Sequence, residues 1–482
     1  MARVWWVRQQ CTFALVALCC AFACGPGNAA QHSIPESVVD TLRAARIPTE
    51  DVALIVQETG EQSPLLDHGM DRPMNPASVM KLLTTFVALD ALGPAYRWKT
   101  EVYAQGEIKD GVLNGDLAIK GYGNPDLSLS DLWLMLREVQ QRGVRAINGD
   151  LLLDNSHFKI VQTDPGAFDN EPWRAYNVIP DALLVNGKTL ELQLIPEPET
   201  KSVRITHGSG LPPLNVVNEL KLGDGPCRDW KDLISVAVDD TADPAHLTLR
   251  GEYRAACEEK IFYLSAFDHA RYVHAIFKQL WTELGGVLKG KLKAGKIGPG
   301  ARLIFTQFSR PLSEVVRDIN KHSNNVMARN LLLTLGAEFS GVPASVESGA
   351  SVLERWLTER GLRFPDLVVD NGSGLSRSGR ITARSLSELL MTAYRSAVMP
   401  EFVASLPIVA VDGTMRTRLA RSQVAGHAHI KSGSLNGVNA MAGYLTDNAG
   451  RQMVVVFLIN HSNAAGGKYA QDALLEWIYA RP

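Results

Sequence analysis

Ser78 and Lys81 have the residue types and the spacing of a serine nucleophile and its base. They begin and end the segment Ser-Val-Met-Lys, at the start of a stretch with helical periodicity. Positions i and i+3 share one face of a helix, so the hydroxyl and the amine point the same way. The helix N-terminus favours alkoxide character on the serine and a neutral amine on the lysine. A neutral lysine can take the proton of the serine hydroxyl.

A second segment with the same spacing, Ser156-His157-Phe158-Lys159, shows that Ser-x-x-Lys alone is not specific. It follows residues 149–153, whose alternation is typical of a strand. On a strand, positions i and i+3 face opposite sides of the sheet. The sequence therefore favours the first copy as the catalytic pair.

A hydroxyl and an amide lie two positions apart in Ser323-Asn324-Asn325. This tripeptide falls within residues 311–335, whose periodicity predicts a helical region. Taken alone, it reads most simply as a capping or solvated polar patch. It becomes informative only through its place between two other motifs.

Lys431-Ser432-Gly433 ends a strand predicted at residues 425–431. A lysine and a hydroxyl in this position suit a substrate carboxylate, and Gly433 would let a ligand approach the backbone closely. In isolation, a solvated strand lysine is the commoner interpretation. The order of the three motifs, on helix, helix and strand, gives them their joint meaning.

The elements around these motifs predict an α+β core. Residues 52–57 read as a strand, and the helix that carries Ser78 begins at Asn75 and ends before Gly93-Pro94. Later helices are expected at 268–284, 311–335, 350–360, 383–395 and 468–478, and later strands at 425–431, 440–446 and 454–459. A strand and a helix at the front can close one core with the strands and helix at the back.

The stretch between the front and back elements has a different character. Short alternating segments separated by Gly, Pro and Asn/Asp predict a β-rich structure. We therefore predict a discontinuous catalytic domain of residues 31–95 plus 266–482, interrupted by one or two small β-rich domains at 96–265.

The composition is that of a globular protein, with 482 residues, 46% hydrophobic and 21% charged, and a formal net charge of -2. These values exclude a disordered or collagen-like chain. The balanced charge offers no field of one sign for nucleic acid, so a nucleic-acid partner is not expected.

The first thirty residues have the pattern of a secretory signal peptide. Arg3 and Arg8 precede an apolar run at 11–24, and small residues follow through Ala30. Cleavage after Ala23 or Ala30 fits the pattern, and Cys24 leaves a lipid anchor as an alternative. Neither this run nor any later segment is long and apolar enough to cross a bilayer. We expect a protein secreted across the inner membrane into the periplasm, with at most peripheral membrane association.

Two cysteines, Cys227 and Cys257, lie beyond this N-terminal segment. An oxidising compartment favours a disulfide between them, which would close a loop of about thirty residues. Two buried free thiols are the alternative. Neither cysteine belongs to a catalytic motif.

The three motifs in this order resemble those of serine β-lactamases and penicillin-binding proteins. Ser78 and Ser323 are separated by 245 positions, more than a β-lactamase would show. This insertion is similar to that of the D-alanyl-D-alanine carboxypeptidase/endopeptidases of the penicillin-binding protein 4 type. Segments 370–377, 411–416 and 435–444 also resemble that family, so the resemblance covers essentially the whole mature chain.

The resemblance implies a β-lactamase/transpeptidase-like fold and a serine-type D-Ala-D-Ala carboxypeptidase or endopeptidase that acts on peptidoglycan stem peptides and cross-links. Ser78 would form the acyl-enzyme and Lys81 would take its proton. Ser323 would relay a proton to the leaving amine, with Lys81 and Lys431 holding its hydroxyl in place, and Asn325 would bind the acyl-side amide. The implied partners are peptidoglycan peptides and inhibitory β-lactams, and no metal or organic cofactor is implied.

Five residues are implied on the substrate-binding side. Ser432 would join Lys431 at the terminal carboxylate, Gly433 would let the ligand approach the backbone, and the Ser434 N–H would help to form the oxyanion hole. Arg377 would line the site. Asp154 would reach the diamino acid of the stem, although it fits equally well as a turn cap. The family usually has Thr-Gly-Thr where this chain has Ser-Gly-Ser, so we expect an altered rate with retained activity.

Other interpretations stay open at this point or lose their motifs. A β-lactamase, a D-amino-acid esterase and a catalytically idle peptidoglycan-binding protein are the alternatives. His427 and His429 alternate on a predicted strand, but without a third ligand we expect no metal site. The chain has no His-Glu-x-x-His, Cys-x-x-Cys or Gly-x-Ser-x-Gly, which removes metalloprotease, thiol-redox and α/β-hydrolase hypotheses.

Overall fold

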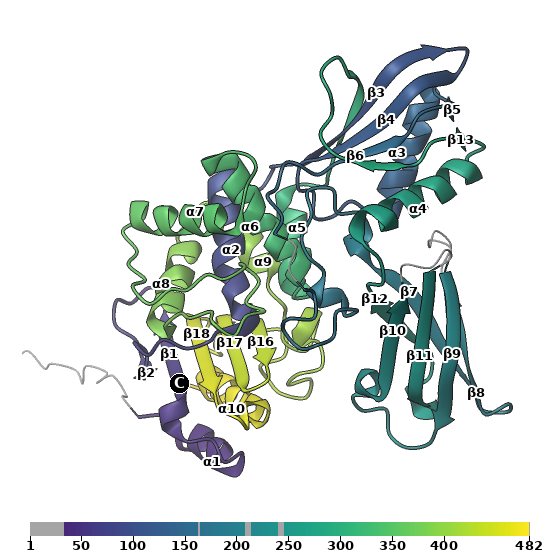
Figure 1. The fold of residues 1–482 in the computed structure, drawn as a ribbon. Coiled ribbons are helices and arrows are strands. Elements are labelled where there is room, and N and C mark those ends of the chain that lie inside the picture. Colours follow the sequence, from purple (N-terminus) through teal and green to yellow (C-terminus); the bar gives the residue numbers. More distant parts are fainter. Residues whose placement is uncertain (1–32, 162–163, 208–213, 240–244, 482) are drawn as a thin grey trace, which may run out of the picture.

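The computed structural model describes residues 33–161, 164–207, 214–239 and 245–481 (Figure 1). The predicted signal peptide at 1–30 lies outside the described residues. Within the described ranges, none of the helices has the length and apolar character needed to span a membrane.

A five-stranded antiparallel sheet joins the front of the chain to its back. Its strands lie in the order β16 (Ala428–Leu435), β17 (Val438–Thr446), β18 (Gln452–Asn460), β1 (Val52–Glu58) and β2 (Leu66–His68). The pairing of β1 with β18 runs from Val52 opposite Ile459 to Glu58 opposite Met453. Both ends of the chain therefore build one core, which confirms the predicted α+β arrangement.

Helices cover both faces of this sheet (Figure 1). One face carries α2 (Lys81–Leu92), α5 (Leu312–Lys321), α6 (Asn325–Ser340), α7 (Val346–Glu359), α8 (Ala383–Tyr394) and α9 (Met399–Ser405). The other carries α1 (Glu36–Ala44) and α10 (Lys468–Tyr479). Ala53 and Ile55 join the first core and Val52 and Val56 the second, as alternation along a strand requires. Burial on both faces explains the continuous apolar run at 454–459.

The helical region predicted at 311–335 is two helices in the structure. Ser323 lies between α5 and α6 and has a positive φ of 56°. The Asn324 side chain caps α6 by accepting a hydrogen bond from the Met327 N–H. Both helices bury their apolar sides in the same core, so the apolar pattern continues through the break and concealed it.

The inserted region contains a second, mixed sheet. Its main path is β13 (Val287–Leu288), β5 (Ala146–Ile147), β4 (Val112–Gly121), β3 (Lys99–Lys109) and β15 (Arg302–Phe308), while β6 (Leu151–Asp154) pairs with β4 and with β14 (Leu292–Ala294). Two helices pack into its core, α3 (Leu129–Gln141) and α4 (His269–Glu283). Helix α3 was not predicted, because the short alternating segments on either side of it favoured strands and turns throughout the stretch.

The strand pairing carries the inserted region past its predicted end at residue 265. β15 pairs antiparallel with β3, and β13, β14 and α4 belong to the same layer, so the chain returns to the central core only after Phe308. The assignment of 266–308 to the catalytic domain disagrees with this pairing. The apolar stripe of α4 shows which side of the helix is buried and contains no information about which core receives it.

Two smaller sheets complete the inserted region. One contains β12 (Lys260–Leu264), β7 (Leu190–Glu197) and β8 (Ser202–His207), and the other β10 (Ile234–Asp239), β11 (Ala245–Arg254) and β9 (Leu214–Gly223). Cys227 and Cys257 form a disulfide in this part of the chain, with an S–S distance of 2.08 Å. The disulfide excludes the alternative of two free thiols.

Candidate active site

Ser78 lies in a short 3-10 turn, η2 (Ala77–Met80), that runs directly into α2. The prediction placed it in the first α-helical turn, whereas the α-helix itself begins at Lys81. Ala77 has a positive φ of 46°, and its N–H donates to the Asn75 side-chain oxygen at 2.9 Å. Strained backbone of this kind persists where the surroundings hold it in place, and it clusters at active sites.

Lys81 is fully buried and its amine contacts three oxygen atoms. Nζ lies 2.9 Å from the Ser78 hydroxyl, 2.6 Å from Asn325 Oδ1 and 2.6 Å from the Ser373 carbonyl oxygen. A neutral amine has two N–H groups and one lone pair. It can donate to the two carbonyl oxygens and turn its lone pair toward the serine hydroxyl, which is the arrangement that a general base needs.

The electrostatic surroundings favour this neutral form. Burial lowers the pKa of Lys81 well below its ordinary value, and the positive charges of Lys431 and Arg329 lower it further. Burial also lowers the pKa of Lys431, to about 7. A pKa of about 7 means that Lys431 is partly charged at neutral pH and loses its charge as the pH rises.

Ser323 and Lys431 form a second pair. Lys431 Nζ donates to the Ser323 hydroxyl at 2.9 Å and to the Ser432 carbonyl oxygen at 2.7 Å. The positive φ of Ser323 turns the loop between α5 and α6 so that this hydroxyl meets the lysine of β16. The structure thus brings together the five residues that were predicted to be catalytic.

Gly433 lies where β16 passes the serine turn. A Cβ atom at this position would lie 2.8 Å from both the Pro76 carbonyl oxygen and the Ser78 nitrogen, so only glycine fits without a shift. The prediction assigned this glycine to a close approach of ligand, and the structure shows a close approach of backbone. Ser434 follows on β16 and is exposed. Because Gly433, directly before it, meets the Ser78 nitrogen, the N–H groups of Ser434 and Ser78 lie on neighbouring segments.

The segment 370–377 supports the serine turn from the other side. The Ser373 carbonyl oxygen accepts from Lys81, and a Cβ on Gly374 would lie 1.9 Å from the Ala77 carbonyl oxygen. Gly374 has a positive φ of 77°, which also favours glycine. This segment was predicted only to resemble the family, and no role was predicted for Ser373. The two glycines of this segment, at positions 372 and 374, were the sequence signal that could have indicated a close backbone contact.

Arg377 and Ser432 lie on the rim of the site. Arg377 donates to the Asn436 carbonyl oxygen at 3.2 Å, and its guanidinium lies 4.5 Å from the ring centroid of Phe168, a residue of the inserted region. The Ser432 hydroxyl lies 2.8 Å from the Thr414 hydroxyl. Thr414, which was not predicted, therefore adds a second hydroxyl beside the position proposed for the carboxylate.

Asp154 does not join these residues. It is 1% exposed at the end of β6, where its carboxylate accepts from the Ser156 N–H and the Ile297 N–H, each at 3.0 Å. Lys120 Nζ lies 3.9 Å from it. This environment corresponds to the turn-capping alternative.

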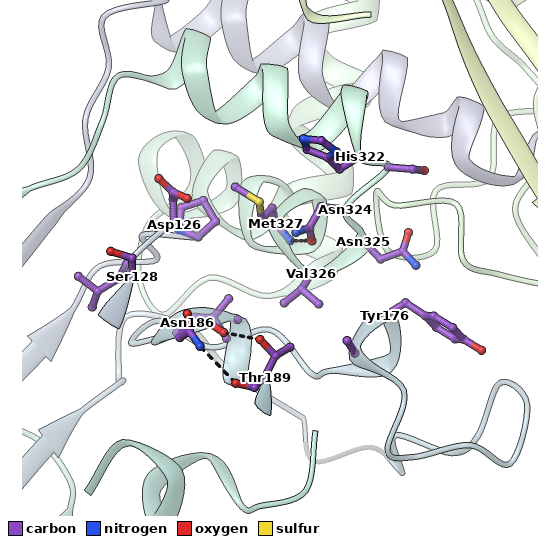
Figure 2. Close-up of a pocket in the computed structure, with 16 residues that line it drawn as sticks. Asp126, Ser128, Tyr176, Asn186, Thr189, His322, Asn324, Asn325, Val326 and Met327 are labelled. Atoms are coloured by element: carbon purple, nitrogen blue, oxygen red, sulfur yellow. Dashed lines mark hydrogen bonds between the residues drawn. The ribbon is translucent and has the colours of Figure 1, made fainter. Parts of the chain in front are cut away.

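A pocket of about 360 Å³ lies beside the segment that contains Ser323 (Figure 2). One wall is the start of α6 and the loop before it. The other wall belongs to the inserted region and includes Tyr176, Asn186 and Thr189. In Figure 2, the Tyr176 ring lies on the same side as the Asn325 amide. Side chains of the inserted region thus border the space next to a catalytic motif.

The two histidines considered as metal ligands contact different parts of the structure. His429 Nδ1 lies 3.2 Å from the Val403 carbonyl oxygen, whereas the His427 ring packs against Tyr479 with centroids 5.1 Å apart. Over the ranges that the structure describes, no group of three or more His, Cys, Asp and Glu side chains is arranged to hold a metal ion.

A comparison with protein families gives a match that extends over nearly all of the chain. The model of the D-Ala-D-Ala carboxypeptidase 3 (S13) family matches residues 35–480. The chain belongs to this family. It is therefore a serine-type D-Ala-D-Ala carboxypeptidase of the penicillin-binding protein class, which confirms the predicted resemblance and enzyme class.

Individual relatives support the same assignment. The D-alanyl-D-alanine carboxypeptidase DacB of Haemophilus influenzae is 25% identical over 414 residues, which are 85% of each chain. A D-alanyl-D-alanine carboxypeptidase of Actinomadura sp. is 27% identical over 436 residues, 86% of this chain and 78% of that one.

Solved structures establish the fold. The crystal structure of penicillin binding protein 4 from Haemophilus influenzae matches with a TM-score of 0.76 and 23% identity over 92% of this chain and 100% of that one. A structure of the same protein in complex with a β-lactam has a TM-score of 0.72, with 22% identity over the same shares of the two chains. The predicted α+β, transpeptidase-like fold with a β-rich insertion is confirmed.

Proposed function

We propose that this carboxypeptidase cleaves peptidoglycan stem peptides and cross-links through an acyl-enzyme on Ser78. The observation that carries the proposal is the Lys81 amine, buried and only 2.9 Å from the Ser78 hydroxyl. A buried amine between two other cationic groups is a base at neutral pH, and a serine beside such a base is an activated nucleophile.

In the acylation step, Ser78 Oγ attacks the carbonyl carbon of the penultimate D-alanine and its proton moves to Lys81 Nζ. The backbone N–H groups of Ser78 and Ser434 stabilise the negative oxygen of the tetrahedral intermediate. The C–N bond to the last D-alanine then breaks. Ser323, held by Lys431, passes its proton to the leaving amine and takes the proton from Lys81 in return, which leaves Ser323 as a hydroxyl and Lys81 neutral.

In the deacylation step, water attacks the ester on Ser78 and releases the shortened peptide, and the serine regains its proton. Asn325 orients the acyl chain through its amide. In the earlier acylation step, before the last D-alanine leaves, Lys431 and the paired hydroxyls of Ser432 and Thr414, 2.8 Å apart, bind the terminal carboxylate of the substrate. Apart from the attacking water, residues of the chain supply the groups that this cycle uses.

The site of action that we propose is the periplasm, because the N-terminal sequence has the pattern of a secretory signal. We propose peptidoglycan peptides as substrates and β-lactams as inhibitors, the latter because a β-lactam presents the same carbonyl and carboxylate to Ser78 and Lys431. The carboxypeptidase reaction requires a substrate with a free C-terminal carboxylate, whereas the endopeptidase reaction cleaves a D-amino-acid cross-link.

Labelling with a fluorescent penicillin tests the nucleophile. The unmutated protein should form a covalent adduct that survives denaturing electrophoresis, and Ser78→Ala should abolish it. The matched control is Ser156→Ala, which alters the other Ser-x-x-Lys segment, in the loop after β6. A stable adduct on Ser78→Ala would show that another residue is the nucleophile. An adduct that is lost within seconds would indicate a β-lactamase, and no adduct on the unmutated protein would indicate an idle binding protein.

A further inference from the structure

Arg329 is a charged residue of α6 to which the reaction described above gives no role. It lies four positions after Asn325, so the two side chains share one face of the helix. Asn325 Oδ1 contacts the Lys81 amine at 2.6 Å. The helix therefore places a guanidinium one turn beyond the residue that holds the base.

The guanidinium of Arg329 is poorly compensated. It donates to the Val178 carbonyl oxygen at 3.2 Å, whereas its buried Nε atom has no hydrogen-bond partner among the described residues. Burial lowers the pKa of Arg329 to about 10, and the negative charge of Asp370 opposes this shift. Arg329 therefore keeps its positive charge throughout the neutral pH range.

The amine of Lys81 contacts the Ser78 hydroxyl of η2, the Asn325 amide of α6 and the Ser373 carbonyl oxygen of segment 370–377. Lys431 of β16 and Arg329 of α6 act on it through their positive charges. None of these groups is a carboxylate. Lys431 loses its charge near pH 7, since burial lowers its pKa to about 7. Above that pH, Arg329 is the cation of this set that remains charged.

We propose that Arg329 is a positioning residue for acylation, which keeps Lys81 in its neutral form and ties α6 to the inserted region through Val178. The proposal rests on the proposed function, because it assumes that Lys81 is the base for Ser78. A positive charge near a lysine disfavours its protonation. The bond to Val178 fixes that charge relative to both the base and the inserted region.

The test is the pH dependence of acylation by a fluorescent penicillin, measured as the second-order rate constant over roughly pH 5 to 9. Arg329→Gln removes the charge and retains an amide N–H near Val178. Its rising limb should move to higher pH by about one unit, because Lys81 is then protonated more easily. Asp370→Asn removes the negative charge near Arg329 and should move the rising limb to lower pH, by about half a unit.

Arg363→Gln is the matched control, since it removes an exposed arginine after α7 and should leave the profile unchanged. If Arg329→Gln lowered the acylation rate by the same factor at every pH, the role of Arg329 would be structural only, and the proposal would be overturned. If Arg329→Gln does not fold, Asp370→Asn provides the test, because Asp370 is exposed. A rising limb at the same pH as in the unmutated protein would then overturn the proposal. Failure of the unmutated protein to form any adduct would instead refute the proposed function.

Discussion

At the scale of single residues, the three oxygens around Lys81 have different roles. Two are acceptors on rigid supports, Asn325 Oδ1 and the Ser373 carbonyl oxygen, and each lies 2.6 Å from Nζ. The third is the Ser78 hydroxyl at 2.9 Å. Because the two acceptors take the N–H groups, the lone pair of a neutral amine has one direction left, toward the serine. Burial then keeps the amine neutral, so geometry and protonation act together.

The two lysines predict a bell-shaped pH profile of kcat/KM for peptides that end in a free D-Ala carboxylate. Lys81 must be neutral, and its lowered pKa gives a rising limb on the acid side. Lys431 must be protonated to hold the carboxylate, and its pKa of about 7 gives a falling limb above pH 7. Steady-state assays of D-alanine release would record both limbs.

An acylating substrate without the carboxylate is the control for this profile. A peptide amide should show the rising limb and a much weaker falling limb, because it makes no ionic contact with Lys431. A falling limb of equal size for both substrates would contradict the assignment of Lys431 to the carboxylate.

At the scale of elements, the site depends on how closely three backbone segments approach one another. The turn η2 is enclosed between β16 and the segment 370–377, and a glycine lies at each contact. Gly433 meets the Ser78 nitrogen and Gly374 meets the Ala77 carbonyl oxygen. These contacts hold Ala77 at its positive φ and fix the direction of the serine hydroxyl.

Gly433→Ala is therefore expected to impair both stability and acylation. The new methyl would lie 2.8 Å from two backbone atoms of the serine turn, so the turn or the strand must move. We expect a loss of about 1–3 kcal/mol in the free energy of unfolding and a fall of about 100-fold in the rate of penicillin acylation. Denaturant titration and stopped labelling reactions would measure the two effects.

Gly60→Ala serves as the control for this substitution. A Cβ at Gly60 meets no atom within 4 Å, so the alanine variant should acylate like the unmutated protein. Unchanged acylation in Gly433→Ala would mean that the serine turn tolerates the displacement of β16.

At the scale of the whole molecule, α6 connects the two halves of the protein. Its first residue is Asn325, and Asn330, one turn further on, donates to the carbonyl oxygens of Gly123 at 3.3 Å and Asp181 at 2.9 Å in the inserted region. Trp98 Nε1, just before β3, donates to Thr334 Oγ1 at 2.9 Å. The inserted region is thus attached to the helix that presents a catalytic amide, while its smaller sheets lie further away (Figure 1).

The disulfide lies in the part of the inserted region that is away from α6. We therefore expect its loss to lower the stability of the protein without a comparable effect on catalysis. Replacing Cys227 and Cys257 by serine should lower the free energy of unfolding by about 3–4 kcal/mol, because the bond closes a long loop. Circular dichroism during thermal unfolding would show the loss. The rate of penicillin labelling at 25 °C should stay within about twofold of the unmutated protein. A parallel loss of labelling would show that the smaller sheets support the site.

Each motif is local, and the order of the three motifs gave joint meaning to patterns that are weak alone, so the residues predicted to be catalytic were accessible from sequence. A serine and a lysine three positions apart on a helical turn face the same way whatever surrounds them, and a glycine after a strand lysine indicates a tight contact. The apolar runs of β17, β18 and α10 were equally local, since each element shows its own period. The break at Ser323 was not accessible, because both helices bury their apolar sides in the same core.

From the sequence we predicted a serine with its lysine, the partners Ser323, Asn325 and Lys431, and an α+β chain with a long insertion. Three-dimensional contacts were needed to find which atoms hold Lys81, that Asp154 caps a turn, and that the chain returns to the core after Phe308. Spacing along the chain encodes which side of an element is buried. It does not encode the partner on that side, and the partners here come from segments hundreds of positions apart, such as Lys81 and Ser373.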